Sequence, residues 1–96
     1  MKINIGKTEL IHFVGIGGIG MSGLALIMDS LGFKIQGSDK SDNKNLNLLR
    51  KRKIPIYLNH NKQNIKNCTV LVVSSAIKKS NPEYKQAKKL NLPIYK

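Results

Sequence analysis

The chain alternates between short apolar runs and longer stretches in which apolar residues recur every three or four positions. The short runs have the length of β-strands. The first and fourth are almost wholly apolar, as expected for strands that are buried on both faces of a parallel sheet. The predicted strands cover residues 10–16, 33–38, 54–58, 69–75 and 92–95.

Three helices are predicted between these strands. The first follows a glycine-rich loop and ends at Gly32. The second covers residues 42–52, and the third begins at Asn81, an N-cap residue followed by Pro82, and runs to about Leu90. The apolar residues expected on the buried helix faces are Met21, Leu24, Ala25, Met28 and Leu31 in the first helix and Leu46, Leu48 and Leu49 in the second.

Regular alternation of strands and helices is typical of a parallel sheet with helices on both faces. Crossovers between parallel strands are right-handed, which restricts the possible strand orders. We therefore expect a single domain over residues 1–96 with a Rossmann-like three-layer α/β fold. Its five parallel strands should lie in the order 3-2-1-4-5.

The composition is strongly basic. The 96 residues include 17 Lys plus Arg against 5 Asp plus Glu, a formal net charge of +12. Such a charge suits nucleic acid or an anionic membrane. However, Lys and Asn fill polar positions along the whole chain, and only five aromatic residues are scattered among the basic ones. We therefore expect neither a nucleic-acid partner nor a membrane partner.

The remaining composition excludes several classes of protein. No apolar run approaches the length of about 18 residues that a membrane-spanning helix requires. A secretory leader is not recognisable, so we expect a cytoplasmic protein. Cys68 is the single cysteine, which excludes an internal disulfide and a zinc cluster, and we interpret it as a small core residue.

A glycine-rich loop joins the first strand to the first helix. Gly15, Gly17 and Gly20 match G-x-G-x-x-G in the strand–loop–helix context that a dinucleotide fingerprint requires. Gly15 is expected to allow the tight turn, Gly17 the approach of a phosphate, and Gly20 the close packing of helix on strand. The free amides and the dipole of the helix N-terminus predict a bound anion, in particular a pyrophosphate. The alternative is a turn that serves packing alone.

Asp39 lies 19 residues after Gly20, at the end of the second predicted strand. An acid at about this spacing binds ribose hydroxyls in dinucleotide-binding domains. The alternative is that Asp39 caps the following helix, but Asp42 is better placed for that role. At this point an NAD(P)-binding module of an oxidoreductase or of a channel regulator fits the sequence.

Further motifs point to a different nucleotide. The loop "HFVGIGGIGMSGLA" (12–25) is followed by "GSD" (37–39), "NH" (59–60) and "VVSSAIKKSNPE" (72–83). In this order and at these spacings, over essentially the whole chain, they resemble the N-terminal domain of the Mur ligase family. The likeness is to those members that join L-alanine to UDP-N-acetylmuramate in peptidoglycan synthesis. A sibling that attaches a whole peptide to the same nucleotide has a similar first domain but a different glycine loop.

The resemblance implies a Rossmann-like domain that binds the UDP part of UDP-N-acetylmuramate. It implies that ATP and Mg²⁺ bind a central domain, and that this chain holds no cofactor, metal or catalytic residue of its own. The loop would cradle the pyrophosphate, His60 would reach it, and the serines would add hydroxyls at the carboxyl ends of the strands. The implied substrate-binding residues are Gly15, Gly17, Gly18, Ile19, Gly20, Ser22, Ser38, Asp39, His60, Ser74, Ser75 and Ala76.

Two positions depart from the family pattern, which has glycine just before the histidine and before the third strand. Here these positions hold Asn59 and Lys53. Asparagine tolerates left-handed backbone geometry, so we expect the turn at Asn59 to survive. His12 lies within the first predicted strand, and we interpret it as structural.

The chain contains no G-x-x-x-x-G-K-[ST] loop for ATP and magnesium. Its two histidines, one cysteine and five acids do not suggest a nucleophile–base pair. We therefore expect the chain to bind substrate without catalysing the reaction, as the first domain of a longer ligase. L-Alanine and ATP would be partners of the missing domains.

Overall fold

The computed structural model describes residues 6 and 8–96 and has the expected α/β architecture. All strand pairs are parallel, and the sheet order is β3-β2-β1-β4-β5, which confirms the predicted order 3-2-1-4-5. The strands are β1 (Leu10–Val14), β2 (Lys34–Ser38), β3 (Ile56–Tyr57), β4 (Val70–Val73) and β5 (Ile94–Tyr95). The helices are α1 (Ile19–Ser30), α2 (Asn45–Lys51), the short 3₁₀ helix η1 (Lys62–Ile65) and α3 (Pro82–Lys89).

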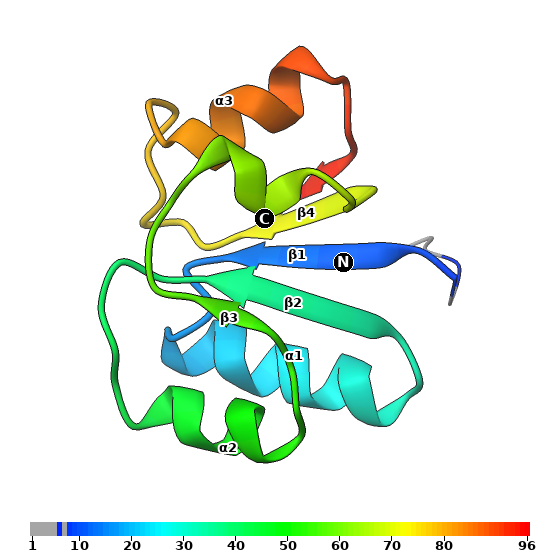
Figure 1. Ribbon diagram of the computed structural model, residues 1–96, viewed down its shortest axis with the longest axis vertical. Helices are drawn as coiled ribbons and strands as arrows, with labels where there is room; N and C mark the ends of the chain where they lie inside the picture. The colour runs from blue at the N-terminus through cyan, green and yellow to red at the C-terminus, as the bar shows by residue number, and fades with distance from the viewer. Residues whose placement is uncertain (1–5, 7) are drawn as a thin grey trace.

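The sheet forms the middle of three layers. Helices α1 and α2 cover one face, and α3 covers the other (Figure 1). Strand β1 shows why both faces need apolar cover. Its Ile11 and Phe13 pack under α1 and α2, whereas Val14 packs with Ile65 and Ala87 on the opposite face. The near-continuous apolar pattern of β1 therefore reflects burial on two sides.

Helix ends follow the predicted signals at two of three places. Helix α1 stops before Gly32, which has a φ of 95°. Asn81 caps α3 by accepting hydrogen bonds from Glu83 N at 2.9 Å and Tyr84 N at 3.3 Å, and Pro82 opens the helix. Both predictions are confirmed.

The start of α2 was predicted wrongly. The helix begins at Asn45 rather than at residue 42, and Asp42 does not cap it. Asp42 instead forms an ion pair with Arg50 at 2.9 Å, while Asn43 Oδ1 accepts a hydrogen bond from Asn45 N. The first backbone amides of a helix can donate to any short polar side chain that precedes them. Where several Asp and Asn residues precede a helix, the sequence alone does not identify the one that caps it.

Two apolar helix residues are not buried as predicted. Leu31 and Leu48 are each 56% exposed, whereas Ala25, Met28, Leu46 and Leu49 lie in the core. Leu31 is already the C-cap residue of α1, so the helical spacing no longer sets its direction. Leu48 lies between two inward-facing positions on the seven-residue helix α2, where the buried stripe is narrow.

The backbone at Lys53 explains why the family pattern has glycine before the third strand. Lys53 has a φ of 62°, the left-handed conformation that glycine adopts most easily. The non-glycine residues with positive φ in the described chain are Lys53 and Asn91, so Asn59 does not adopt the left-handed geometry that we expected there. Cys68 is buried in the core, which confirms its structural role.

The few acidic side chains all have specific partners. Asp29 and Asp42 form ion pairs with Arg52 and Arg50, and Glu9 accepts a hydrogen bond from Gly6 N at 2.8 Å. Asp39 and Glu83 accept hydrogen bonds near the carboxyl ends of the strands. Among the described residues, no lysine forms an ion pair. None of the described helices is long and apolar enough to span a lipid bilayer.

Candidate functional site

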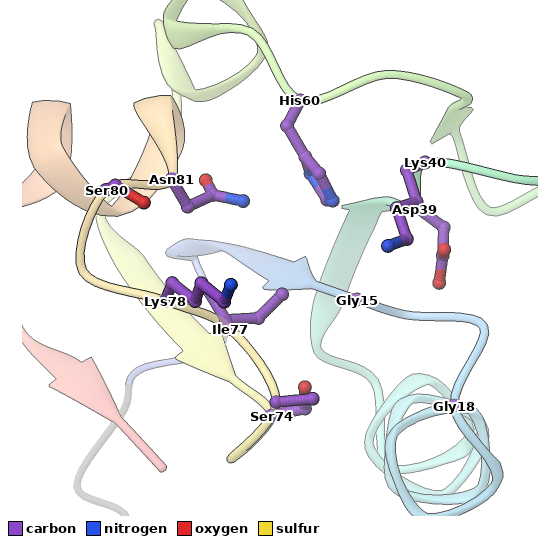
Figure 2. A pocket seen from close by; sticks show the side chains of 11 residues that line it. Gly15, Gly18, Asp39, Lys40, His60, Ser74, Ile77, Lys78, Ser80 and Asn81 are labelled. Atoms are coloured by element: carbon purple, nitrogen blue, oxygen red, sulfur yellow. The ribbon is translucent and has the colours of Figure 1, made fainter.

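A cavity of about 450 Å³ opens at the carboxyl ends of β1, β2 and β4. This is the edge at which open α/β sheets bind their ligands. Figure 2 shows the glycine loop along one side of it and side chains converging on it from the segment after β2, from the loop after β3 and from the segment between β4 and α3. The lining residues are Gly15, Gly18, Asp39, Lys40, His60, Ser74, Ala76, Ile77, Lys78, Ser80 and Asn81.

The cavity brings together half of the residues predicted from the sequence. The lining includes Gly15, Gly18, Asp39, His60, Ser74 and Ala76. The other six predicted residues lie outside the lining: Gly17, Ile19, Gly20, Ser22, Ser38 and Ser75. Whether each lining residue contacts a ligand stays a prediction.

The glycine loop leaves the sheet through a sharp turn. Gly15 has a φ of 82°, and the amides of Gly15 and Ile16 both donate to the carbonyl of Ser38, at 2.8 and 3.0 Å. Gly18 is the N-cap of α1, and no side chain caps the helix there. The first turn of α1 therefore presents backbone amides and the positive end of the helix dipole next to the cavity.

Gly17 has close contacts within the chain, and the predicted approach of a phosphate to it stays a prediction. Its amide donates to Asp39 Oδ2 at 2.8 Å, and its carbonyl accepts from the side chains of Asn43 and Asn45. A Cβ added to Gly17 would lie 2.7 Å from both Asp39 Oδ2 and Asn43 Nδ2. The missing side chain thus makes room for Asp39 and Asn43, which tie the loop to the segment after β2.

Gly20 does not serve close packing, which corrects the prediction for it. It is exposed, and a Cβ there would meet nothing within 4 Å. Close packing occurs instead at Gly37 in β2, where a Cβ would collide with the side chain of Ile16 in the glycine loop and lie 2.9 Å from Phe13 O of β1. Gly37 precedes Ser38 in the "GSD" motif, but its packing role was not recognised from the sequence.

The hydroxyl of Ser22 is turned away from the cavity. Ser22 is buried in α1, and its Oγ donates to the carbonyl of Ile19 at 3.2 Å. A hydroxyl of this kind commonly bonds to the preceding turn of its own helix. Ile19 itself is 85% exposed at the start of α1.

A buried hydrogen-bond network stands behind His60. Ser38 Oγ lies 3.0 Å from His60 Nδ1 and donates to Glu83 Oε1 at 2.5 Å. Glu83 also accepts from His12 Nε2 at 2.7 Å, from Asn64 Nδ2 at 2.7 Å and from Asn61 N at 3.2 Å. Ser38 therefore lies behind the cavity between His60 and Glu83, and His12 is structural, as predicted.

Glu83 is a fully buried carboxylate. Burial by itself raises the pKa of such a group, but the hydrogen bond and the charge attraction of His12, together with the hydrogen bonds from Ser38 and Asn64, outweigh it, so the pKa of Glu83 lies below its ordinary value. The carboxylate is thus held in its charged form. Each side-chain nitrogen and oxygen buried in the described structure has a hydrogen-bond partner.

Two lysines on the cavity wall were missed in the sequence. Lys40 follows Asp39 directly, and Lys78 lies in the segment between β4 and α3. Both lie within a few residues of the carboxyl end of a central strand. This position in the sequence is the signal that could have identified them as cavity residues. With a net charge of +12, however, no single lysine stands out along the chain. The cavity therefore combines two ammonium groups, an imidazole and a helix N-terminus with one carboxylate, a set that suits an anion.

Comparison with known proteins identifies the family of this chain. The family described as "Mur ligase family, catalytic domain" matches residues 10–96. The chain belongs to the Mur ligase family. Of the described residues, no three His, Cys, Asp or Glu side chains gather into a metal-binding group in this Mur ligase domain.

Individual relatives are similar over nearly the whole domain. A UDP-N-acetylmuramate–L-alanine ligase of Pelagibacter ubique is 62% identical over 96 residues, which are 100% of this chain and 21% of that protein. The solved UDP-N-acetylmuramate–alanine ligase of Thermotoga maritima is 38% identical with a TM-score of 0.86, covering 91% of this chain and 20% of that one.

A sibling ligase is similar to a lesser degree. The UDP-N-acetylmuramate:L-alanyl-gamma-D-glutamyl-meso-diaminopimelate ligase of Neisseria meningitides is 28% identical with a TM-score of 0.81, covering 90% of this chain and 28% of that one. This Mur ligase domain thus spans about a fifth of the length of the curated relatives it matches.

Proposed function

We propose that this chain is the substrate domain of a ligase of peptidoglycan synthesis and binds the UDP part of UDP-N-acetylmuramate. The observation that carries the proposal is the basic cavity beside the uncapped N-terminus of α1, in a chain 62% identical to a named UDP-N-acetylmuramate–L-alanine ligase. The whole ligase would use ATP and Mg²⁺, held by other parts of the protein, to join L-alanine to the substrate in the cytoplasm.

The charges of the cavity support a diphosphate as the bound group. A diphosphate carries negative charge on two neighbouring phosphates. Lys40, Lys78 and His60 offer cationic or proton-donating groups on opposite sides of the cavity (Figure 2). Backbone amides at the start of α1 add further hydrogen-bond donors. Because these amides are uncharged, no charged side chain has to lose its hydration shell when they bind an anion.

Asp39 is the one carboxylate in the lining, and its role fits this proposal. One of its oxygens, Oδ2, accepts a hydrogen bond from the amide of Gly17 and so stabilises the glycine loop. Its second oxygen, Oδ1, lies 3.5 Å from the amide of Ser41 and remains available to a hydroxyl of the ligand. A ribose hydroxyl is the group that an acid at the end of the second strand binds in related folds.

Titration calorimetry of the 96-residue chain tests the proposal. The ligands are UDP-N-acetylmuramate, UDP and NADH, each at physiological salt, where exposed charges are screened beyond about 8 Å. We expect binding of both uridine nucleotides and weaker binding of NADH. Tighter binding of NADH would favour the dinucleotide alternative and overturn the proposal.

A matched pair of lysine variants tests the location. Lys78→Ala removes a charge from the cavity wall, whereas Lys34→Ala removes one from the opposite, amino-terminal end of β2. We expect Lys78→Ala to weaken UDP-N-acetylmuramate about ten-fold, as loss of a charged contact does, and Lys34→Ala to leave it unchanged. Equal effects of the two variants would mean that net charge, and not this cavity, attracts the nucleotide.

The absence of turnover is a separate expectation. Phosphate release with ATP, Mg²⁺, L-alanine and UDP-N-acetylmuramate should stay at background for this chain. Phosphoryl transfer depends on positioned metal and phosphate-binding groups, and the sequence contains no loop of the ATP-binding type. Turnover by the chain alone would refute its assignment as a substrate domain.

A further inference from the structure

Glu83 lies outside the cavity lining, yet it is joined to the cavity by an unbroken chain of hydrogen bonds. The chain runs from Glu83 Oε1 through Ser38 Oγ to His60 Nδ1, with distances of 2.5 and 3.0 Å. Glu83 and Ser38 are fully buried, and His60 is the member that lines the cavity. Figure 2 shows the imidazole projecting into the cavity from the loop after β3.

The direction of each hydrogen bond in this chain follows from the partners. A serine hydroxyl has a single proton, and Ser38 donates it to the ionised carboxylate of Glu83. Ser38 Oγ must then accept its second hydrogen bond, so His60 carries a proton on Nδ1. The other ring nitrogen, Nε2, is therefore the one left for a ligand.

His12 also faces the buried carboxylate. Its Nε2 lies 2.7 Å from Glu83 Oε1, and its Nδ1 lies 2.8 Å from the amide nitrogen of Gln36, which donates to the carbonyl of Asn64 at 2.7 Å. Glu83 thus has four hydrogen-bond donors, and Ser38 is the one that joins it to His60.

We propose that Glu83, acting through Ser38, is a positioning residue that fixes the proton of His60 on Nδ1. Binding of an anion at Nε2 of His60 would then be accompanied by the uptake of one proton. An anionic oxygen near Nε2 needs a proton there, and that proton comes from solvent, giving an imidazolium between the bound anion and Glu83. The proposal rests on the proposed function only in taking a uridine diphosphate group as the anion.

The other charged groups around His60 do not take over this role. Lys40 and Lys78 line the same cavity and would favour the anion itself, and Asp39 already accepts from the amide of Gly17. The buried carboxylate on α3 is the group joined to the imidazole through Ser38. His60 Nδ1 lies 3.6 Å from Glu83 Oε1, so the two groups are close without a direct hydrogen bond.

The experiment compares the chain with Ser38→Ala and with Ser30→Ala as control. Both changes delete one hydroxyl, but that of Ser30 donates to the carbonyl of Ile27 on the exposed side of α1. Long-range ¹H–¹⁵N NMR of the imidazoles reports the tautomer of His60 in the free protein. Calorimetry of UDP-N-acetylmuramate in buffers of different ionisation enthalpy reports proton uptake on binding.

We expect the Nδ1–H form of His60 and uptake of a proton in the chain and in Ser30→Ala. In Ser38→Ala we expect the Nε2–H form, loss of the proton uptake and about ten-fold weaker binding. An Nε2–H form in the unsubstituted chain, or an unchanged tautomer in Ser38→Ala, would overturn the inference. Failure of the unsubstituted chain to bind the nucleotide would count against the proposed function alone, since the tautomer is measured without ligand.

Discussion

Replacing Glu83 by glutamine should cost this small domain a large part of its stability. Glutamine keeps the shape of the side chain but exchanges one oxygen for an amide nitrogen. If the remaining oxygen serves His12 and Ser38, the new nitrogen faces the donors Asn61 N and Asn64 Nδ2. Two part-buried donors then lose this acceptor, and Asn64 Nδ2 keeps only its hydrogen bonds to Asn59.

The size of the effect follows from those two donors. An unsatisfied buried donor costs about 1–3 kcal/mol, and part-buried donors fall in the lower half of this range, so the two together cost about 2–4 kcal/mol. The substitution also removes the cost of keeping a charge in a site that is 0% exposed, which acts in the opposite direction. We therefore expect Glu83→Gln to lower the free energy of unfolding by about 2–3 kcal/mol, against a total of roughly 5–15 kcal/mol for typical domains.

Urea unfolding followed by circular dichroism at pH 7 measures this difference. The matched control is Glu9→Gln, because the carboxylate of Glu9 accepts from Gly6 N in an exposed hydrogen bond. We expect the control to change the free energy of unfolding by less than about 0.5 kcal/mol. An equally small change in Glu83→Gln would refute the view that the network around the carboxylate stabilises the fold.

The pH dependence provides a second measurement on the same pair. The folded pKa of Glu83 lies below the ordinary value of 4.5, so the unfolded chain binds a proton more readily than the folded one. The stabilisation is complete above the ordinary pKa and is lost as pH falls through the folded pKa. The stability difference between the chain and Glu83→Gln should therefore shrink below about pH 4.5.

Three backbone substitutions give further predictions, each measured as a change in unfolding free energy. Lys53→Gly should stabilise by about 0.5 kcal/mol, since Lys53 has a φ of 62°; destabilisation would contradict the assigned strain. Gly37→Ala should destabilise by about 2–3 kcal/mol, because the new Cβ meets Ile16 and Phe13 O; a neutral result would deny the close packing. Gly20→Ala should stabilise by about 0.5 kcal/mol, as its Cβ enters open space in α1; a loss of stability would show hidden contacts.

The fold was predictable because the burial of each strand and helix determines which of its positions must be apolar. Strands covered on both faces, such as β1 and β4, must be apolar at nearly every position, and the glycine loop marks the turn from β1 into α1. The strand order followed from handed crossovers. Helix ends were less predictable, since Asp42 and Asn43 are both suitable caps and only the path of the chain decides between them.

The site was predictable only in part, and the reason is geometric. Sequence motifs identified residues near the carboxyl ends of the strands, among them Gly15, Asp39 and His60, all of which line the cavity. They could not tell a residue that faces the cavity from one that supports it, which is why Ser38 was grouped with ligand-binding residues. Glu83 ends the motif "VVSSAIKKSNPE" (72–83), but its burial among four donors depends on contacts between distant segments.

The specific partners of the acidic side chains have a consequence for how this sequence tolerates change. All five carboxylates engage an amide, a guanidinium or the buried network, whereas the lysines of the described chain form no ion pairs. In a library of random substitutions, most lysine positions should therefore accept neutral or acidic residues, whereas Glu83 in the buried network and Asp39 at the glycine loop should not. The domain could lose much of its net charge of +12 at little cost, while these two negative charges are the ones least open to replacement.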